Sequence, residues 1–346
     1  MRSRVADWLG FSSKDEFNKF FLLSTIFSLI IGVYWFLRPL KDSVFMTVVG
    51  GNYIPMAKFL SLIVVFPLVI IYSKLVDILP RHKLFYILAT LYGIMALGFA
   101  VLMATPGIGM ANAVASPYRF WGWAWYVYVE SFGSLLPILF WAFAADTTMP
   151  DVAKRGFPFI SFIAQFGVLL GCSINAGRFG VFSITTTLLG SAVAMVMIAL
   201  MVYIFMQSVS VDQLKSYNSG AADKKGKKAS FMDAFRLMFS QPYLLGILFS
   251  IVIYEVLNTL FDFKFKTLVA EAVQRYIIDN NIAVDQIGAI KTQMFNQWTG
   301  SMGEWMSILG IVAYLLGLGK MYRQNSAEFS NFRWPWWAAF GRHNHM

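Results

Sequence analysis

Long apolar runs dominate this chain and limit the folds open to it. An α-helix needs about 20 mainly apolar residues to cross the hydrocarbon core of a membrane. Apolar residues make up 58% of the 346 residues and charged residues 13%, whereas soluble domains have about 45–50% and about 25%. The sequence therefore predicts an all-α, multi-pass membrane protein. The expected spans are 19–37, 56–79, 84–105, 120–145, 157–177, 183–207, 243–263 and 301–319.

The positive charges indicate how these spans are oriented. The net charge is +10, but the cations lie mainly in loops between spans, so we expect contact with membrane lipid and no nucleic-acid partner. Cytoplasmic loops carry an excess of Lys and Arg, which predicts a cytoplasmic N-terminus. The deciding cations are Arg2, Arg4, Lys14, Lys19, Arg81, Lys83, Lys154, Arg155, Lys215, Lys224, Lys225, Lys227, Lys228 and Arg236.

The polar segment 209–242 divides the chain. It contains NSGAADKKGKKAS, a composition typical of a basic cytoplasmic linker. It separates a complete six-helix bundle, 19–208, from a partial second bundle, 243–346, and residues 1–18 form a cytoplasmic extension. Six spans, a basic loop and further spans are the plan of major-facilitator-type transporters.

The partial second bundle holds two expected spans. We expect a long extracytoplasmic loop with short amphipathic helices between them, from Lys264 to Gly300. Trp334–Phe340 resembles the start of a ninth span, but the sequence stops at Met346. We therefore expect a fragment of a longer protein, and a natural eight-helix protein is the alternative.

The loop between the second and third spans, SKLVDILPRHK, is similar to the facilitator loop pattern G-x-L-x-D-x-x-G-R-K. Two glycines of the pattern are replaced, by Ser73 and Pro80. In that pattern an acid and basic residues join neighbouring helix ends as the protein rocks. The corresponding gating residues here are Asp77, Arg81 and Lys83.

Glu130 lies near the middle of the fourth span. It is 11 residues after Arg119 and 16 before Asp146, which is roughly 16 and 24 Å along a helix at about 1.5 Å per residue. Insertion of an acid at this depth costs about 2.5–3.5 kcal/mol. We therefore expect a role in substrate binding or proton coupling, with a structural ion pair as the alternative.

The stretch YWFLRPLKDSVF closes the first span with an unusual set of charges. If the helix continues past Pro39, Arg38, Lys41 and Asp42 share one face because they stand at i, i+3 and i+4. Two cations and one acid predict a net positive pocket for an anion, phosphate above all. The alternative is an interfacial anchor, which the expected position on the outer side disfavours.

A further charged group, NTLFDFKFK, ends the seventh span. It contains Asn258, Asp262, Lys264 and Lys266. Asp262 and Lys266 are four residues apart, so they could pair with each other. Participation in the substrate site is the other interpretation.

Motifs for enzymes and metals are missing from the sequence. His82, His343 and His345 have no metal-ligand spacing, and Cys172 lies in an apolar run. The sequence contains no Walker loop and no G-x-S-x-G elbow. We expect a transporter that is not an enzyme and has no metal, no cofactor and no obligate protein partner.

These stretches together resemble the nucleotide transporter family, the ATP/ADP translocases of obligate intracellular bacteria and plastid envelopes. FLRPLKDSVF is similar to the family's R-x-x-K-D at the end of its first helix. VESFGSLLPILFWAFAADTT resembles E-L-W/Y-G-S-x-x-x-x-L-F-W-x-F-A-N-x-x-T, with the glutamate, Gly-Ser, Phe-Trp and final threonine in register. QPYLLGI resembles S-P-Y, and FKFK resembles aromatic-Lys-x-Lys. The resemblance covers residues 20–340.

The resemblance implies a twelve-helix facilitator-type protein, in a bacterial inner membrane, that exchanges ATP for ADP or imports nucleotides. It implies that Lys41 and Glu130 are needed for transport. Ungapped counting puts an acidic position of the family's seventh helix at Leu260, two residues from Asp262. A truncated, non-transporting relative and a carrier of another phosphorylated organic anion remain alternatives.

Overall fold

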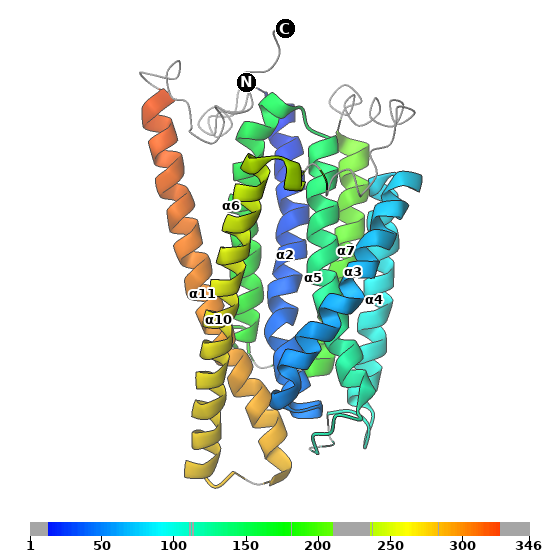
Figure 1. Ribbon diagram of the computed structural model, residues 1–346, viewed down its shortest axis with the longest axis vertical. Helices are drawn as coiled ribbons and strands as arrows, with labels where there is room; N and C mark the ends of the chain where they lie inside the picture. The colour runs from blue at the N-terminus through cyan, green and yellow to red at the C-terminus, as the bar shows by residue number, and fades with distance from the viewer. Residues whose placement is uncertain are drawn as a thin grey trace.

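The computed structural model is an all-helical bundle in which long helices run alternately up and down (Figure 1). It describes residues 13–110, 112, 114–180, 182–209, 236, 238–282 and 284–325. In chain order the elements are α2 (Lys14–Val48), the 3-10 helix η1 (Gly51–Tyr53), α3 (Ile54–Ile78), α4 (Arg81–Ala104), α5 (Phe120–Asp146), α6 (Pro150–Asn175), α7 (Ile184–Ser208), α10 (Pro242–Asp279) and α11 (Val284–Asn325).

Hydropathy locates most of the helices correctly. Within the described residues, seven helices are long and apolar enough to cross a membrane, namely α2 to α7 and α10. The eighth expected span, 301–319, lies inside α11. Residues 1–12, most of the linker 209–242 and residues 326–346 fall outside the described part of the chain.

The predicted end of the first span at residue 37 is wrong, because α2 continues through Pro39 to Val48. Proline has no backbone N–H, so the carbonyl four residues earlier, on Trp35, loses its helical donor. Asn175 at the end of α6 compensates, since its Nδ2 donates to Trp35 O at 3.3 Å and to Phe36 O at 2.7 Å. Neighbouring helices commonly satisfy such freed groups in membranes. The charged motif therefore lies within a helix and not at its end.

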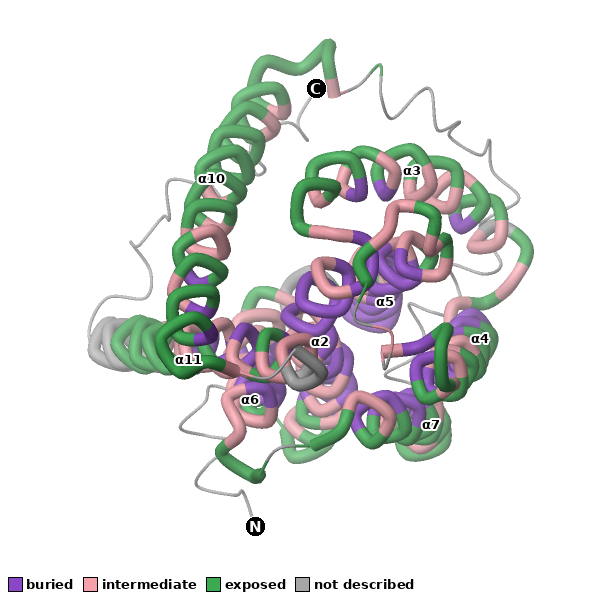
Figure 2. The backbone as a smooth tube through the Cα atoms, turned by 90° about the horizontal axis from the view of Figure 1, so that it is seen from below, coloured by how far each residue is buried: buried purple, intermediate pink, exposed green. Residues whose placement is uncertain are grey.

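α2 is the central helix of the bundle and is largely buried (Figure 2). It packs most extensively against α6 and also contacts α5, α7 and α11. Small residues allow the close approach to α6, because a side chain at Gly171 would collide with the carbonyl oxygen of Gly32 on α2. Such small-residue contacts are typical of membrane helices, which gain little from apolar burial between them.

The long loop expected from Lys264 to Gly300 is also wrong. Most of that stretch continues α10 and begins α11, and the two helices form a hairpin whose described turn residues, 280–282, extend beyond the other helices (Figure 1). Val269, Val273 and Ile277 repeat every four residues on one face of α10 and pack with Phe295 of α11. We call this end of the bundle the hairpin end, and the end that holds the α3–α4 and α5–α6 connections the opposite end.

Candidate functional site

Six charged side chains from three helices form one connected network. Lys41 on α2 pairs with Glu130 Oε1 on α5. Lys266 Nζ on α10 lies 2.6 Å from Asp42 Oδ2 on α2 and 2.6 Å from Asp262 Oδ2 on its own helix. Arg38 Nη2 donates to Asp262 Oδ1 at 3.5 Å. We call Arg38, Lys41, Asp42, Glu130, Asp262 and Lys266 the charged network.

Charge compensation explains how this network tolerates burial. Asp42 is 1% exposed and Lys41 4% exposed, and an isolated ion at such a site would be very costly. The network holds three cations and three anions, so its formal charge is balanced. The expected net positive set rested on α2 alone, and α5 and α10 add two acids and one cation to it, so the six-residue network itself is neutral.

Aromatic rings contact two of the cationic side chains in the network. Lys41 Nζ lies 4.4 Å from the ring centroid of Tyr126, and the Arg38 guanidinium lies 5.0 Å from that of Trp35. A cation over a ring face is attracted by the ring quadrupole. Trp35 and Tyr126 thus orient the two α2 cations toward opposite helices, α10 and α5.

A cavity of about 340 Å³ lies against the network, between α2, α3, α5 and α10. We call it the polar cavity. Arg38, Lys41, Glu130, Asp262 and Lys266 line it together with Lys58 and Glu255. Sequence reasoning missed Lys58 and Glu255, although each lies inside an expected span. The criterion that selected Glu130, an ionisable residue at membrane depth, would have found both.

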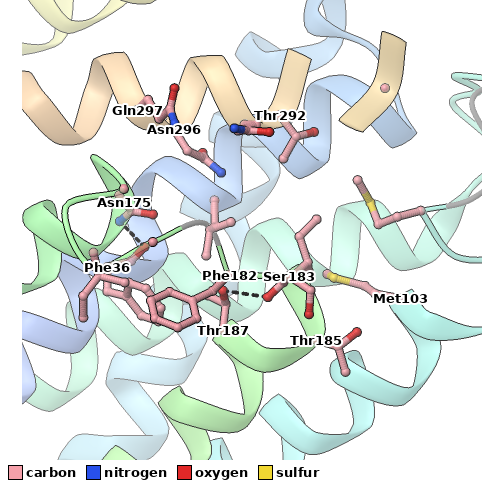
Figure 3. Close-up of a pocket in the computed structure, with 18 residues that line it drawn as sticks. Phe36, Met103, Asn175, Phe182, Ser183, Thr185, Thr187, Thr292, Asn296 and Gln297 are labelled. Atoms are coloured by element: carbon pink, nitrogen blue, oxygen red, sulfur yellow. Dashed lines mark hydrogen bonds between the residues drawn. The ribbon is translucent and has the colours of Figure 1, made fainter. Parts of the chain in front are cut away.

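A separate cavity of about 500 Å³ lies at the hairpin end and has no ionisable side chain in its lining. Figure 3 shows Asn175, Thr187, Thr292, Asn296 and Gln297 around it. We call it the uncharged cavity. Its described lining offers no cation to a phosphate group.

Lys264 does not join the charged network. It is exposed on α10 and lines none of the described cavities, although it is two residues from Lys266. Helical geometry explains this, because residues two apart point to different faces of a helix. Asn258, by contrast, lines the polar cavity.

Ion pairs also join helices at both ends of the bundle. At the opposite end, Arg81 at the start of α4 pairs with Asp146 at the end of α5. Lys83 is exposed, and the side chain of Asp77 lies outside the described part of the structure. At the hairpin end, Arg178 makes three hydrogen bonds of 2.9–3.2 Å to Glu304 on α11. These bonds raise the pKa of the Arg178 guanidinium.

No group of three or more His, Cys, Asp or Glu side chains suited to a metal occurs among the described residues. The candidate site is a charged cavity within a helical bundle. Its cations can bind an anion, and its acids can compete with that anion or accept a proton.

Comparison with known proteins places these features in context. The sequence profile of the TLC ATP/ADP transporter matches residues 11–106 and 108–318. ADP,ATP carrier protein 1 of Rickettsia bellii (strain RML369-C) is 27% identical over 295 residues, which cover 74% of this chain and 57% of the carrier. ADP,ATP carrier protein 4 of Rickettsia typhi (strain ATCC VR-144 / Wilmington) is 24% identical over 188 residues, 49% of this chain and 36% of the carrier.

The same coverage appears for ADP,ATP carrier protein 1 of Rickettsia conorii (strain ATCC VR-613 / Malish 7), which is 25% identical over 291 residues, 74% of this chain and 57% of the carrier. The matches thus cover between about a third and just over half of the curated relatives. No solved structure matches the chain.

Proposed function

The chain belongs to the TLC ATP/ADP transporter family, and we propose that it carries nucleotides across a membrane, exchanging ATP for ADP or importing nucleotides. The family is major-facilitator-like. The observation that carries the proposal is the charged network, in which Arg38, Lys41 and Lys266 line one cavity at the junction of α2 and α10.

The cations suit a phosphate chain. Arginine presents a planar fork of donors that matches phosphate oxygens, and lysine supplies a compact point charge. Lys41 is the expected main phosphate contact, because burial makes its charge strongly felt. Arg38 and Lys266 lie on either side of Asp262 and add further donors to the same cavity.

The acids of the network favour exchange of one bound anion for another. Without a nucleotide, Glu130, Asp42 and Asp262 neutralise the three cations, and two of these pairs tie α10 to α2. A nucleotide phosphate competes with the carboxylates, which weakens the tie between the helices. Because a ligand shifts a conformational equilibrium only through differential contacts, the empty carrier stays tied and reorients poorly. This behaviour favours exchange over one-way release.

The ion pairs at the two ends fit alternating access, in which a transporter opens to one side at a time around a central site. We propose that Arg81 and Asp146 act as a gate at the opposite end. Asp77 and Lys83 are proposed as further gating residues on the basis of the loop pattern. The loop cations favour a cytoplasmic location for this end, in a bacterial inner membrane.

The decisive experiment is transport of labelled ATP into proteoliposomes that contain or lack internal ADP. We expect uptake to require internal ADP and Lys41→Ala to reduce it about 10- to 100-fold, the effect of losing one charge-assisted bond of about 1.5–3 kcal/mol. Lys41→Arg should retain part of the activity. Lys264→Ala is the matched control and should transport like the unmodified chain.

Full uptake by Lys41→Ala would contradict the role of the network. Binding of ATP without any transport would identify a non-transporting relative. Faster uptake of a sugar phosphate than of ATP would instead identify a carrier of another phosphorylated anion.

A further inference from the structure

A second cavity lies on the other side of the charged network. It has a volume of about 520 Å³ and is enclosed by α2, α6, α10 and α11; in Figure 2, α10, α11 and α6 lie to the left of the central helix α2. We call it the aromatic cavity. Arg38, Asp42, Asp262 and Lys266 line it and also belong to the charged network. A ligand held by these cations can therefore reach into it.

Rings and amides dominate the rest of its lining. Trp35, Phe265 and Tyr314 are half-buried and come from α2, α10 and α11, and Gln165 and Asn258 contribute amides. Trp35 already has the Arg38 guanidinium over its ring at 5.0 Å. Flat aromatic faces stack on heterocyclic bases, and side-chain amides hydrogen-bond to the edges of bases.

The backbone around Gln165 is held in place across the cavity. Ser307 on α11 is 1% exposed, and its hydroxyl donates to the carbonyl oxygen of Gln165 at 2.7 Å. This bond joins α6 to α11 at the depth where Gln165 lines the cavity. An amide on a fixed backbone can discriminate between bases, because a mismatched base leaves its polar atoms unpaired.

Neither the uncharged cavity nor the polar cavity has this combination of groups in its described lining. The uncharged cavity offers amides but no cation. The polar cavity offers cations, but Tyr34 is the only aromatic residue in its described lining. The aromatic cavity has both kinds of group, since it shares Arg38 and Lys266 with the network.

We propose that the aromatic cavity is the ring subsite of this protein. It takes the heteroaromatic base of a nucleoside di- or triphosphate while the phosphates contact Arg38, Lys41 and Lys266. Trp35 stacks on the base and Gln165 reads its edge, so these two residues determine specificity. The inference rests on the proposed function, because it needs phosphates bound at the charged network.

Competition binding on the purified full-length protein tests the subsite. Labelled ATP is displaced by unlabelled ATP, GTP, CTP or inorganic tripolyphosphate, which has the phosphate chain but no ring. We expect ATP to bind about tenfold more tightly than tripolyphosphate, in keeping with one stacked base. Trp35→Leu should remove most of this difference, and Trp35→Phe should restore part of it.

Gln165→Leu tests the reading of the base edge. It should reduce the preference among ATP, GTP and CTP and leave tripolyphosphate affinity within about twofold, because no phosphate contact is removed. Thr185→Val in the uncharged cavity is the matched control and should change none of these affinities. Size-exclusion profiles establish that each variant is folded.

Each contrary outcome identifies what has failed. Equal affinity of the unmodified chain for ATP and tripolyphosphate would overturn the ring subsite and leave the phosphate site standing. Equal losses of ATP and tripolyphosphate affinity in both Trp35→Leu and Gln165→Leu would also overturn it. If the unmodified chain binds neither compound, the proposed function fails and the ring subsite fails with it.

Discussion

Lys266 on α10 neutralises Asp42 on α2, with its ammonium nitrogen 2.6 Å from a carboxylate that is 1% exposed. Lys41 Nζ, the neighbouring cation on α2, is 3.8 Å from the same carboxylate. Asp42 therefore depends on a residue from the second bundle for its nearest counter-ion. The hairpin of α10 and α11 thus takes part in the electrostatic stability of α2 as well as in its packing.

Removal of Lys266 should destabilise the protein. Lys266→Ala leaves Asp42 buried without its nearest cation, and breaking a buried pair in this way costs about 3–5 kcal/mol. We expect a clearly lower unfolding temperature in detergent. Lys264→Ala, on the exposed face of α10, should change stability by no more than about 0.5 kcal/mol.

The double variant Asp42→Asn/Lys266→Met tests whether the loss of stability comes from the unpaired charge of Asp42. It removes both charges, so it should be more stable than Lys266→Ala alone. An unfolding temperature for Lys266→Ala equal to that of the unmodified chain would show that Lys41 alone satisfies Asp42.

Asn175 should stabilise the protein because it replaces the helical hydrogen bond that Pro39 cannot donate. Asn175→Leu removes the donor to Trp35 O and Phe36 O, and a buried carbonyl without a donor costs about 1–3 kcal/mol. We expect a lower unfolding temperature for this variant. Pro39→Ala should restore part of the loss in the double variant, since alanine supplies the missing helical N–H. Equal losses with and without Pro39→Ala would show that Asn175 acts in another way.

The Arg178–Glu304 pair should control separation of α6 from α11. Cys172, the single cysteine of the chain, is 1% exposed, and a side chain at Gly303 of α11 would collide with it. Alkylation of Cys172 by a maleimide therefore reports opening of this contact. Arg178→Ala should accelerate alkylation several-fold, because it removes the hydrogen bonds to Glu304.

Arg275→Ala, at an exposed position of α10, is the control for this labelling experiment and should leave the alkylation rate unchanged. Unchanged labelling in Arg178→Ala would mean that apolar packing alone keeps α6 and α11 together.

The Arg81–Asp146 pair should respond to charge reversal. Arg81→Glu places two acids together at the start of α4 and the end of α5, and like charges at close range repel. We expect slower exchange of labelled ATP. The double reversal Arg81→Glu/Asp146→Arg should recover much of the rate, whereas an additive loss in the double variant would rule out a gate made by this pair.

The sequence singles out some functional charged residues but cannot separate others, and the reason is physical. Glu130 and Lys41 stand out because ionisable groups are rare at membrane depth. Lys264 and Lys266 look equivalent in FKFK, and only the rotation of α10 separates an exposed lysine from one that contacts Asp42. The continuation of α2 past Pro39 also does not follow from nearby residues, because the backbone N–H that proline lacks is replaced by the side chain of Asn175, far along the chain.

The sequence by itself located most of the long apolar helices, because each is decided by the apolar content of one continuous segment. It also determined which ionisable residues lie within those segments. Only the tertiary structure decided their partners. Arg38 and Asp262 are 224 residues apart in the chain, and they meet because the rotations of α2 and α10 turn these side chains toward each other. Charge balance in the network depends on this arrangement of helices, which no local pattern of residues contains.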